Sequence, residues 1–254
     1  MKEIKPYFLE STRRDRVLMH FFVGANLAVI AFCSIWLLLD WQAAELSPIV
    51  IIATLLCGYF LADIAVGMVH WATDTWFTEE HFGRVIAIAR EHHTHPQHIL
   101  GYSFLEHATL CSAPSALVIG PMAFLTALLP TSGFSIVIMI IYLIIAICML
   151  FGTSLHNLGH RHGHFALTRL LQRYHLVMSP QHHSVHHAGD QTVRYCTVCG
   201  WANYLLDRLN FWRWLELRIQ AITGAIPRDD DVRWQMRYRE TGLMTRSFDN
   251  YVNN

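Results

Sequence analysis

Four long apolar stretches constrain this chain more than any other feature of its sequence. They cover residues 17–39, 48–69, 108–129 and 134–155, and each reaches the roughly 20 residues that a helix needs to cross about 30 Å of hydrocarbon. The first stretch is too long for the core of a signal peptide, and no small-residue cleavage site follows it, so we expect a retained span. The sequence therefore predicts an all-α, polytopic membrane protein with four transmembrane helices.

Basic residues are distributed unevenly around these stretches. Lysine and arginine occur in residues 1–16, between the second and third stretches, and after the fourth, whereas the connectors 40–47 and 130–133 contain none. The positive-inside rule therefore predicts that both termini are cytoplasmic and that the spans form two antiparallel hairpins. The corresponding membrane is the inner membrane in a bacterium or the endoplasmic reticulum in a eukaryote.

Composition limits the remaining classes of function. Basic and acidic side chains balance at 19 each, which gives no overall field that would attract nucleic acid. No repeat or linker divides the chain, so we expect one membrane-embedded domain over residues 1–254, with a cytoplasmic segment at 1–16 and a flexible tail at 228–254. The 17 histidines are the anomaly in this composition.

The first histidine group lies where the second span leaves the membrane. In the segment DIAVGMVHWATD, polar or small residues recur at helical spacing as Asp63, Gly67, His70 and Asp74. On a helix they form one stripe. Because a charged residue inside a span is costly when it faces lipid, we expect Asp63 to face the bundle interior or a hydrogen-bonding partner.

Two further groups flank the third and fourth spans. In the segment FGTSLHNLGHRHGH, the residues Asn157, His160 and His164 share a helix face, with His156 one turn before His160. In REHHTHP, the adjacent His92 and His93 diverge by about 100° on a helix, so that each could serve a different ion.

The densest group is the segment MSPQHHSVHH. Ser179 is suited to cap a helix and Pro180 to be its first residue. The four histidines that follow then form two pairs one turn apart, His182 with His186 and His183 with His187. Two neighbouring stripes of imidazole suit two metal ions better than one.

These groups together predict a shared metal centre in a His-rich cytoplasmic cap. Structural zinc usually takes four ligands and often uses cysteine. Eight or nine histidines with few cysteine or carboxylate partners favour two iron ions instead, on ligand number and type. The single CxxC pair, Cys196 and Cys199, is interpreted as part of a packed loop or strand rather than as a zinc or redox motif.

Several of these segments also carry a resemblance. VHWATDTW, REHHTHP, NLGHRHGH, QHHSVHH and YCTVCGWANYLLDRLNFWRWLELRIQAITGAIPR resemble the plasmanylethanolamine desaturase family, which includes a plant plastid desaturase of phosphatidylglycerol. The similarity runs over about residues 63–228. It implies a membrane di-iron desaturase that uses molecular oxygen, a membrane phospholipid and a small electron donor, either a b-type cytochrome or ferredoxin with its reductase.

The resemblance also assigns residues. The family's histidine motifs match His70, His92, His93, His160, His164, His182, His183, His186 and His187. Asp74 is expected to be a further ligand or to support one. The chain departs from the animal enzymes, which have Asp where it has His95 and an Asn-rich stretch in place of HATLC after Glu106.

These departures bear on the substrate, and the alternatives stay open. A 1-O-alkyl phospholipid would give a vinyl ether, whereas the alternative substrate is an acyl chain of a glycerolipid. A di-iron lipid hydroxylase is the nearest other activity, followed by a divalent-metal transporter and a metal-binding scaffold. For the substrate chain we expect a groove between the second and fourth spans, where room is left by Gly58, Gly67, Gly152 and the small Ala62.

Overall fold

The computed structural model describes residues 11–43, 45–77, 79–161, 165–188 and 191–228. The predicted tail at 229–254 and the first ten residues lie outside them. Every regular element among the described residues is helical. In chain order they are α1 Arg13–Asp40, η1 Trp41–Ala43, α2 Pro48–Thr75, α3 Glu79–Phe82, α4 Arg84–Thr94, η2 His98–Gly101, α5 Phe104–Pro114, η3 Ser115–Ile119, α6 Gly120–Ala127, α7 Gly133–Asn157, η4 Leu158–His160, α8 Ala166–Arg173, α9 Pro180–His187, α10 Trp201–Arg208 and α11 Phe211–Thr223.

The four predicted spans are confirmed. Four helical segments are long and apolar enough to cross a membrane: Arg13–Asp40, Pro48–Thr75, Phe104–Ala127 and Gly133–His160. The chain is thus a multi-pass membrane protein. The second helix continues to Thr75, beyond the apolar run that ends at residue 69, because its last two turns bury their polar stripe in the cap.

Serine or threonine caps fix where each span begins. Ser47 caps α2 with Pro48 as the first helical residue, while Thr12, Ser103 and Ser132 each form a capping box at the start of their helix. Each hydroxyl accepts a hydrogen bond from a backbone N–H that the helix itself leaves unpaired.

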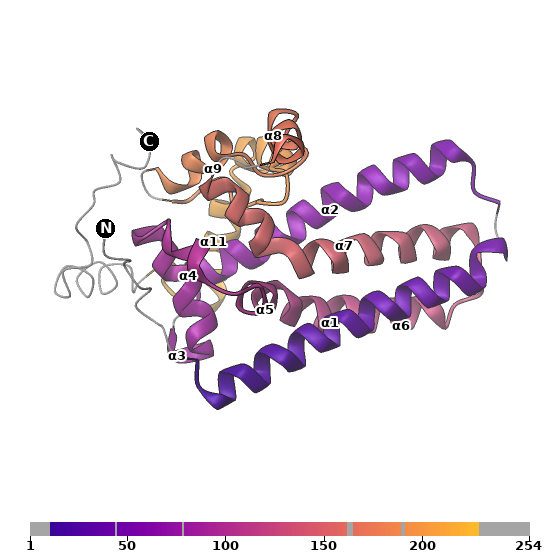
Figure 1. Ribbon diagram of the computed structural model, residues 1–254, viewed down its shortest axis with the longest axis horizontal. Helices are drawn as coiled ribbons and strands as arrows, with labels where there is room; N and C mark the ends of the chain where they lie inside the picture. Colours follow the sequence, from indigo (N-terminus) through magenta and orange to yellow (C-terminus); the bar gives the residue numbers. More distant parts are fainter. Residues whose placement is uncertain (1–10, 44, 78, 162–164, 189–190, 229–254) are drawn as a thin grey trace.

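The four spans pack side by side along the long axis of the molecule, as Figure 1 shows. Their outward side chains are apolar and exposed, among them Leu38 at 81% and Ile49 at 78%. Such surfaces are stable where lipid replaces water.

One polar residue joins three of the spans within the membrane. Asn26 of α1 is fully buried, and its Nδ2 donates to Ser112 Oγ at 3.3 Å and to the Ala146 carbonyl at 3.1 Å. Its Oδ1 accepts from Ser115 Oγ at 2.7 Å. Ser115 begins a turn of π-helix directly after Pro114, which interrupts the third span. These bonds satisfy the amide within the bundle, so Asn26 is a structural tie between helices.

The expectation that Gly58 and Gly67 leave room for a groove between the second and fourth spans is wrong. A Cβ atom on Gly58 would lie 2.7 Å from Ile144 Cδ1, and one on Gly152 would lie 3.0 Å from Cys111 Sγ. On Gly67 it would lie 2.6 Å from Cys196 Sγ. At Gly58 the missing side chain lets a neighbouring helix approach closely, and at Gly67 it admits a loop, so these two glycines close the space instead of opening it.

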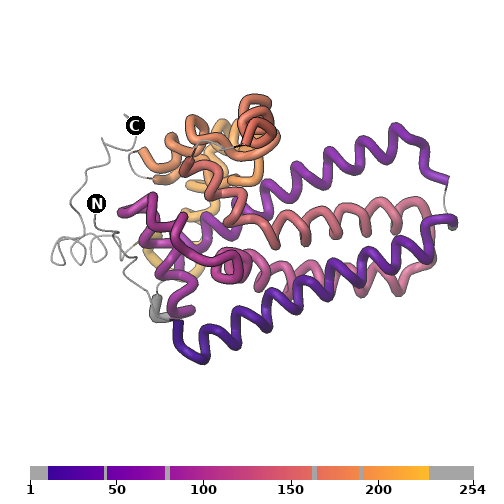
Figure 2. The backbone as a smooth tube through the Cα atoms, viewed as in Figure 1, coloured from indigo at the N-terminus to yellow at the C-terminus, as the bar shows by residue number. Residues whose placement is uncertain are grey.

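The remaining helices form a cap at one end of the spans. Figure 2 shows α4 and the chain from α8 to α11 gathered there, around the end of α2. A loop over residues 191–200, called here the cap loop, crosses α2 between α9 and α10. It is clamped by Asp63, whose Oδ1 accepts the backbone N–H groups of Val198, Cys199 and Gly200 at 2.9–3.2 Å and whose Oδ2 accepts that of Ala202 at 3.1 Å. The prediction that Asp63 faces a hydrogen-bonding partner is confirmed.

Candidate metal centre

Nine side chains converge in two adjacent groups where the spans meet the cap. In each group one ligand atom per residue lies within 4.8 Å of all the others. The five-histidine site consists of His92, His156, His160, His183 and His187. The Asp74 site consists of His70, Asp74, His93 and His186.

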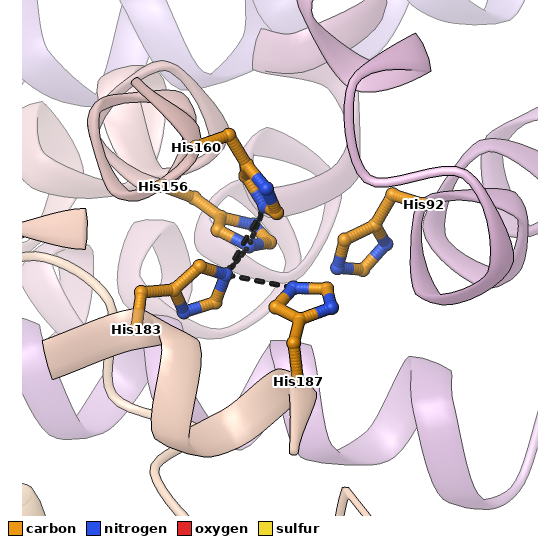
Figure 3. A group of neighbouring side chains, drawn as sticks. All are labelled: His92, His156, His160, His183 and His187. Carbon is orange, nitrogen blue, oxygen red and sulfur yellow. Dashed lines mark hydrogen bonds between the residues drawn. The ribbon is translucent and has the colours of Figure 1, made fainter. Parts of the chain in front are cut away.

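His183 is central to the five-histidine site, as Figure 3 shows. Its Nε2 lies 2.7 Å from that of His156, 3.1 Å from that of His160 and 3.0 Å from that of His187. A neutral imidazole carries only one N–H, so this many converging nitrogens cannot all find donors among themselves. A metal ion bound at about 2.1 Å from each nitrogen would place neighbouring ligands about 3 Å apart, which matches these separations.

His92 completes this site and shows the same need for a cation. Its Nδ1 donates to the Ala89 carbonyl, which leaves a lone pair on Nε2. That Nε2 is buried and has no hydrogen-bond partner among the described residues. A buried acceptor of this kind is costly unless it binds a cation or a donor.

The Asp74 site is built around one carboxylate oxygen. Asp74 Oδ2 lies 3.1 Å from His70 Nε2, 3.2 Å from His93 Nε2 and 3.6 Å from His186 Nε2. A carboxylate with three imidazoles is a donor set typical of iron and other transition metals. The site can therefore hold a metal ion and lower its net charge.

Backbone carbonyls of the cap loop set the tautomers in the Asp74 site. His70 Nδ1 donates to the Tyr195 carbonyl at 2.9 Å, and His186 Nδ1 donates to the Val193 carbonyl at 2.6 Å. Because a carbonyl can only accept, each Nδ1 carries the hydrogen and each Nε2 presents its lone pair to Asp74. Such outer hydrogen bonds orient metal-ligating histidines.

Helix geometry divides neighbouring residues between the two sites. The adjacent His92 and His93 of α4 belong to different sites. On α9, His183 and His187 face one site while His186 faces the other. Helix α9 approaches closely because Gly159 has no side chain, and a Cβ there would lie 2.8 Å from His183 Cβ.

Burial keeps the cap imidazoles in the form that binds metals. It lowers the pKa of His92, His183 and His187 well below the ordinary value. It also lowers the pKa of His186 to about 4, although the hydrogen bond with Asp74 acts in the opposite direction. All four rings are neutral at pH 7, and neutral imidazole is the ligating form.

The structure brings together most of the site residues expected from the sequence. In the two sites lie His70, Asp74, His92, His93, His160, His183, His186 and His187. His164 lies outside the described residues. His156 was not expected as a ligand, although its spacing of four residues from His160 is the same signal that identified the other pairs.

His182 lies outside both sites. It is buried, and its Nε2 accepts from Asn203 Nδ2 at 2.9 Å and lies 3.1 Å from Arg194 Nη1. Burial and the nearby Arg194 guanidinium lower its pKa to about 4. A Cβ on Gly200, whose φ is +82°, would lie 2.6 Å from its Nε2. In this structure His182 joins α9 to the cap loop and to α10.

The cysteine pair has the structural place expected for it. Cys196 and Cys199 are buried free thiols in the cap loop, outside both sites. Burial raises the pKa of both, so they remain protonated.

A second buried acid, on α4 itself, ties this helix to the turn that follows it. Glu91 is fully buried, and its Oε1 accepts from His98 Nδ1 at 3.0 Å while Tyr102 donates to Oε2. Arg90 donates to the Asp74 carbonyl. The helix that carries His92 and His93 is thus tied both to the following turn and to α2.

A narrow cavity of about 20 Å³ reaches both sites from the side of the spans. It is enclosed by α2, α4, α5 and α7, and His70, His92 and His156 border it. Most of its other lining is apolar, including Val66, Val85, Ile88 and Leu110. The cavity is large enough for about one water molecule and lies directly beside the two ligand groups.

Comparison with known proteins identifies related sequences. The family model described as lipid desaturase domain matches residues 59–230. A plasmanylethanolamine desaturase of Myxococcus xanthus is 32% identical over 81% of this chain and 74% of its own length. Plasmanylethanolamine desaturase 1 of Mus musculus is 31% identical over 77% and 74%, and a chloroplastic fatty acid desaturase 4-like protein of Arabidopsis thaliana is 30% identical over 67% and 60%. No solved structure matches the chain.

Proposed function

The chain belongs to the lipid desaturase family, and we propose that it converts the alkyl chain of a 1-O-alkyl glycerophospholipid into a vinyl ether. It is a membrane lipid desaturase, and so an oxidoreductase. The observation that carries the proposal is the pair of adjacent ligand groups at the place where four apolar spans meet the cap.

The metals in this proposal are two iron ions, one in each site. With molecular oxygen they supply oxidising power that no side chain has, which removal of hydrogen from an unactivated carbon chain requires. The lipid loses two hydrogens from neighbouring carbons and gains a double bond. Oxygen is reduced to two water molecules by two electrons and two protons from the lipid and by two electrons and two protons from outside it.

The protein's own residues have three tasks in this reaction. The nine side chains of the two sites would hold and orient the metals, and Asp74 would compensate part of their charge. The mostly apolar lining of the cavity would exclude bulk water from the ligand groups during the reaction. Packing of α2 against α4 and α5 fixes the direction from which the lipid chain reaches the histidines.

The choice of an alkyl rather than an acyl chain rests on the relatives. Two plasmanylethanolamine desaturases match more of this chain than does the plant fatty acid desaturase. We therefore infer an ether phospholipid substrate and keep the acyl chain as the alternative.

Orientation and electron supply complete the proposal. Positive charge on the cap side supports an arrangement with the cap and both termini in the cytoplasm, in the inner membrane of a bacterium or the endoplasmic reticulum of a eukaryote. A b-type cytochrome, or ferredoxin with its reductase, would deliver the two external electrons there.

The test is expression in a host that makes 1-O-alkyl phospholipids but no vinyl ethers. Lipid mass spectrometry should detect a product two hydrogens lighter whose ether bond is cleaved by mild acid. His186→Ala should insert normally and give no product, while His20→Ala, on an exposed histidine of α1 outside both sites, should match the parent. An unsaturated acyl chain would reassign the substrate, an alcohol would establish a hydroxylase, and normal product from His186→Ala would contradict the site.

A further inference from the structure

Helix α8 buries a polar side chain and exposes apolar ones, the opposite of what is expected for a helix on the surface of a water-soluble domain. Its buried residue is Gln172, whose Nε2 lies 2.9 Å from the Leu158 carbonyl and 3.2 Å from that of Met178. Its outward residues are apolar: Leu167 is 65% exposed and Leu170 is 49% exposed. Phe165, directly before the helix, is 77% exposed. Exposed apolar side chains on one short helix indicate a surface that does not face water.

The position of the segment after α8 indicates which surface this is. Tyr59 donates from its hydroxyl to the Leu176 carbonyl at 2.5 Å, and its ring lies 5.9 Å from that of Trp201. Tyr59 precedes His70 by 11 residues on α2, which corresponds to about 16 Å along the helix axis. The chain between α8 and α9 therefore descends beside the membrane-spanning part of α2.

The lipid-facing surface of α2 continues from this point. Ile52 is 58% exposed and Leu56 is 55% exposed, within one or two turns of Tyr59. Figure 1 shows α8 at the outer edge of the cap, further along the direction of the spans than α9. An apolar surface next to lipid-facing side chains is most simply covered by the same lipid.

The charges on α8 agree with a position at a membrane surface. Arg169 and Arg173 are exposed on this helix, one turn apart, and the helix has no acidic residue. Helices that lie in the interface combine apolar side chains in the acyl boundary with basic residues at the head groups.

We propose that α8 lies in the membrane interface on the cap side, with Phe165, Leu167 and Leu170 inserted at the boundary of the acyl chains. The contact fixes the height of the cap relative to the bilayer. Gln172 bonds to the Met178 carbonyl just before α9. The membrane contact of α8 therefore also helps to fix the helix that carries His183, His186 and His187. This inference needs only a membrane-embedded chain, so it stands or falls independently of the proposed substrate.

The experiment places a fluorescent label on α8 in the full chain. Cys57 is exposed and would react with the dye, so it is first replaced by serine. The other five cysteines are buried and can stay. Leu170→Cys is labelled with an environment-sensitive dye and reconstituted in phosphatidylcholine vesicles, with Leu167→Cys as the second variant. Gln181→Cys on α9, also exposed, is the matched control.

Two quenchers then report what covers the label. We expect spin-labelled lipid to quench the α8 labels at least about twofold more than the Gln181 label, and aqueous iodide to do the reverse. Efficient quenching of the α8 labels by iodide would overturn the proposal. Protection from both quenchers would also overturn it, because a second copy or another protein would then cover α8. Agreement between Leu167 and Leu170 excludes an effect of one substitution on folding.

Discussion

The two metal sites differ in what holds them. The five-histidine site lies between helices, because α4, α7 with its terminal turn, and α9 supply all its ligands. In the Asp74 site, two of the three histidines take their orientation from carbonyls of the cap loop, at Tyr195 and Val193. A helix is positioned by many packed side chains, whereas the cap loop depends on a few hydrogen bonds. The Asp74 site should therefore be the more easily disturbed from a distance.

The sites also differ in charge. Five neutral imidazoles leave the full charge of a bound cation, whereas Asp74 removes one unit in the other site. Two iron ions bound in these sites would thus have ligand sets of different charge. The two sites should therefore be tested separately.

The largest effect is expected from His183→Ala. This change removes the central ligand of the five-histidine site, whose Nε2 lies within 3.1 Å of three other imidazoles. Loss of even an outer partner of a metal ligand typically costs 10–100-fold, so product should fall by about 100-fold or more. Iron per chain should fall from about two to about one, as measured by mass spectrometry on purified protein. Retention of both irons with normal product would contradict the assignment of this site.

Asp63→Asn should have the next largest effect and should act on the other site. The carboxylate accepts four backbone N–H groups of the cap loop and α10, and an amide offers one oxygen and places a donor against donors. The loss of charged hydrogen bonds should destabilise the protein by about 3 kcal/mol, seen as a lower Tm in detergent.

The double variant sharpens the comparison. If Asp63→Asn releases iron from the Asp74 site, the single variant should retain about one iron per chain. The double variant with His183→Ala should retain almost none. A double variant that still holds about one iron would show that both changes act on the same ion. The two sites would then not differ in the way described.

The smallest effect is expected from Glu216→Gln, on the far side of the Asp74 site. Glu216 is buried and accepts from Arg228 at 2.9 Å and from Trp71 Nε1 at 3.3 Å, which joins α11 to the end of α2. Burial alone would raise the pKa of Glu216, but hydrogen bonds and charge from Arg228 lower it below its ordinary value. A lowered pKa stabilises the fold above the ordinary value of 4.5, and this contribution is lost as pH falls through the folded pKa.

Thermal unfolding of parent and Glu216→Gln measures this dependence. At pH 7 the variant should be less stable by about 1–2 kcal/mol, and the difference should shrink below pH of about 4.5 as the carboxyl group takes up its proton. Asp74-site iron should change little at pH 7. A Tm difference that is constant from pH 7 to 3 would exclude ionised Glu216 as its cause.

Much of the fold could be predicted because membrane spans have a strong local signal. The four apolar runs, their caps and the polar stripe from Asp63 to Asp74 depend on residues close together in the sequence. The division of His92 and His93 between the two sites also follows from the helical repeat alone.

Tertiary contacts determine the place of His182 and the packing at the glycines, which the local sequence pattern could not predict. His182 and His183 have equivalent spacing on α9, but His182 meets Asn203 and Arg194 from a segment that the periodicity of α9 does not describe. The glycines of α2 were expected to leave space, yet whether a glycine opens a groove or admits a neighbour depends on the partner helix. Ile144 and Cys196 occupy those positions here.

The bonds of Asp63 have a consequence for the order of synthesis. Its first donor, the Val198 N–H, is 135 residues further along the chain, so at ordinary rates of translation α2 is complete on the order of ten seconds before the donors exist. During that interval an aspartate near a helix centre opposes insertion by about 2.5–3.5 kcal/mol. Helix α2 has a mean hydropathy of 2.4 over its most apolar window even with Asp63 included, and its apolar residues must compensate for this aspartate until the C-terminal part arrives. The apolar excess of this span thus serves biogenesis as well as the finished membrane protein.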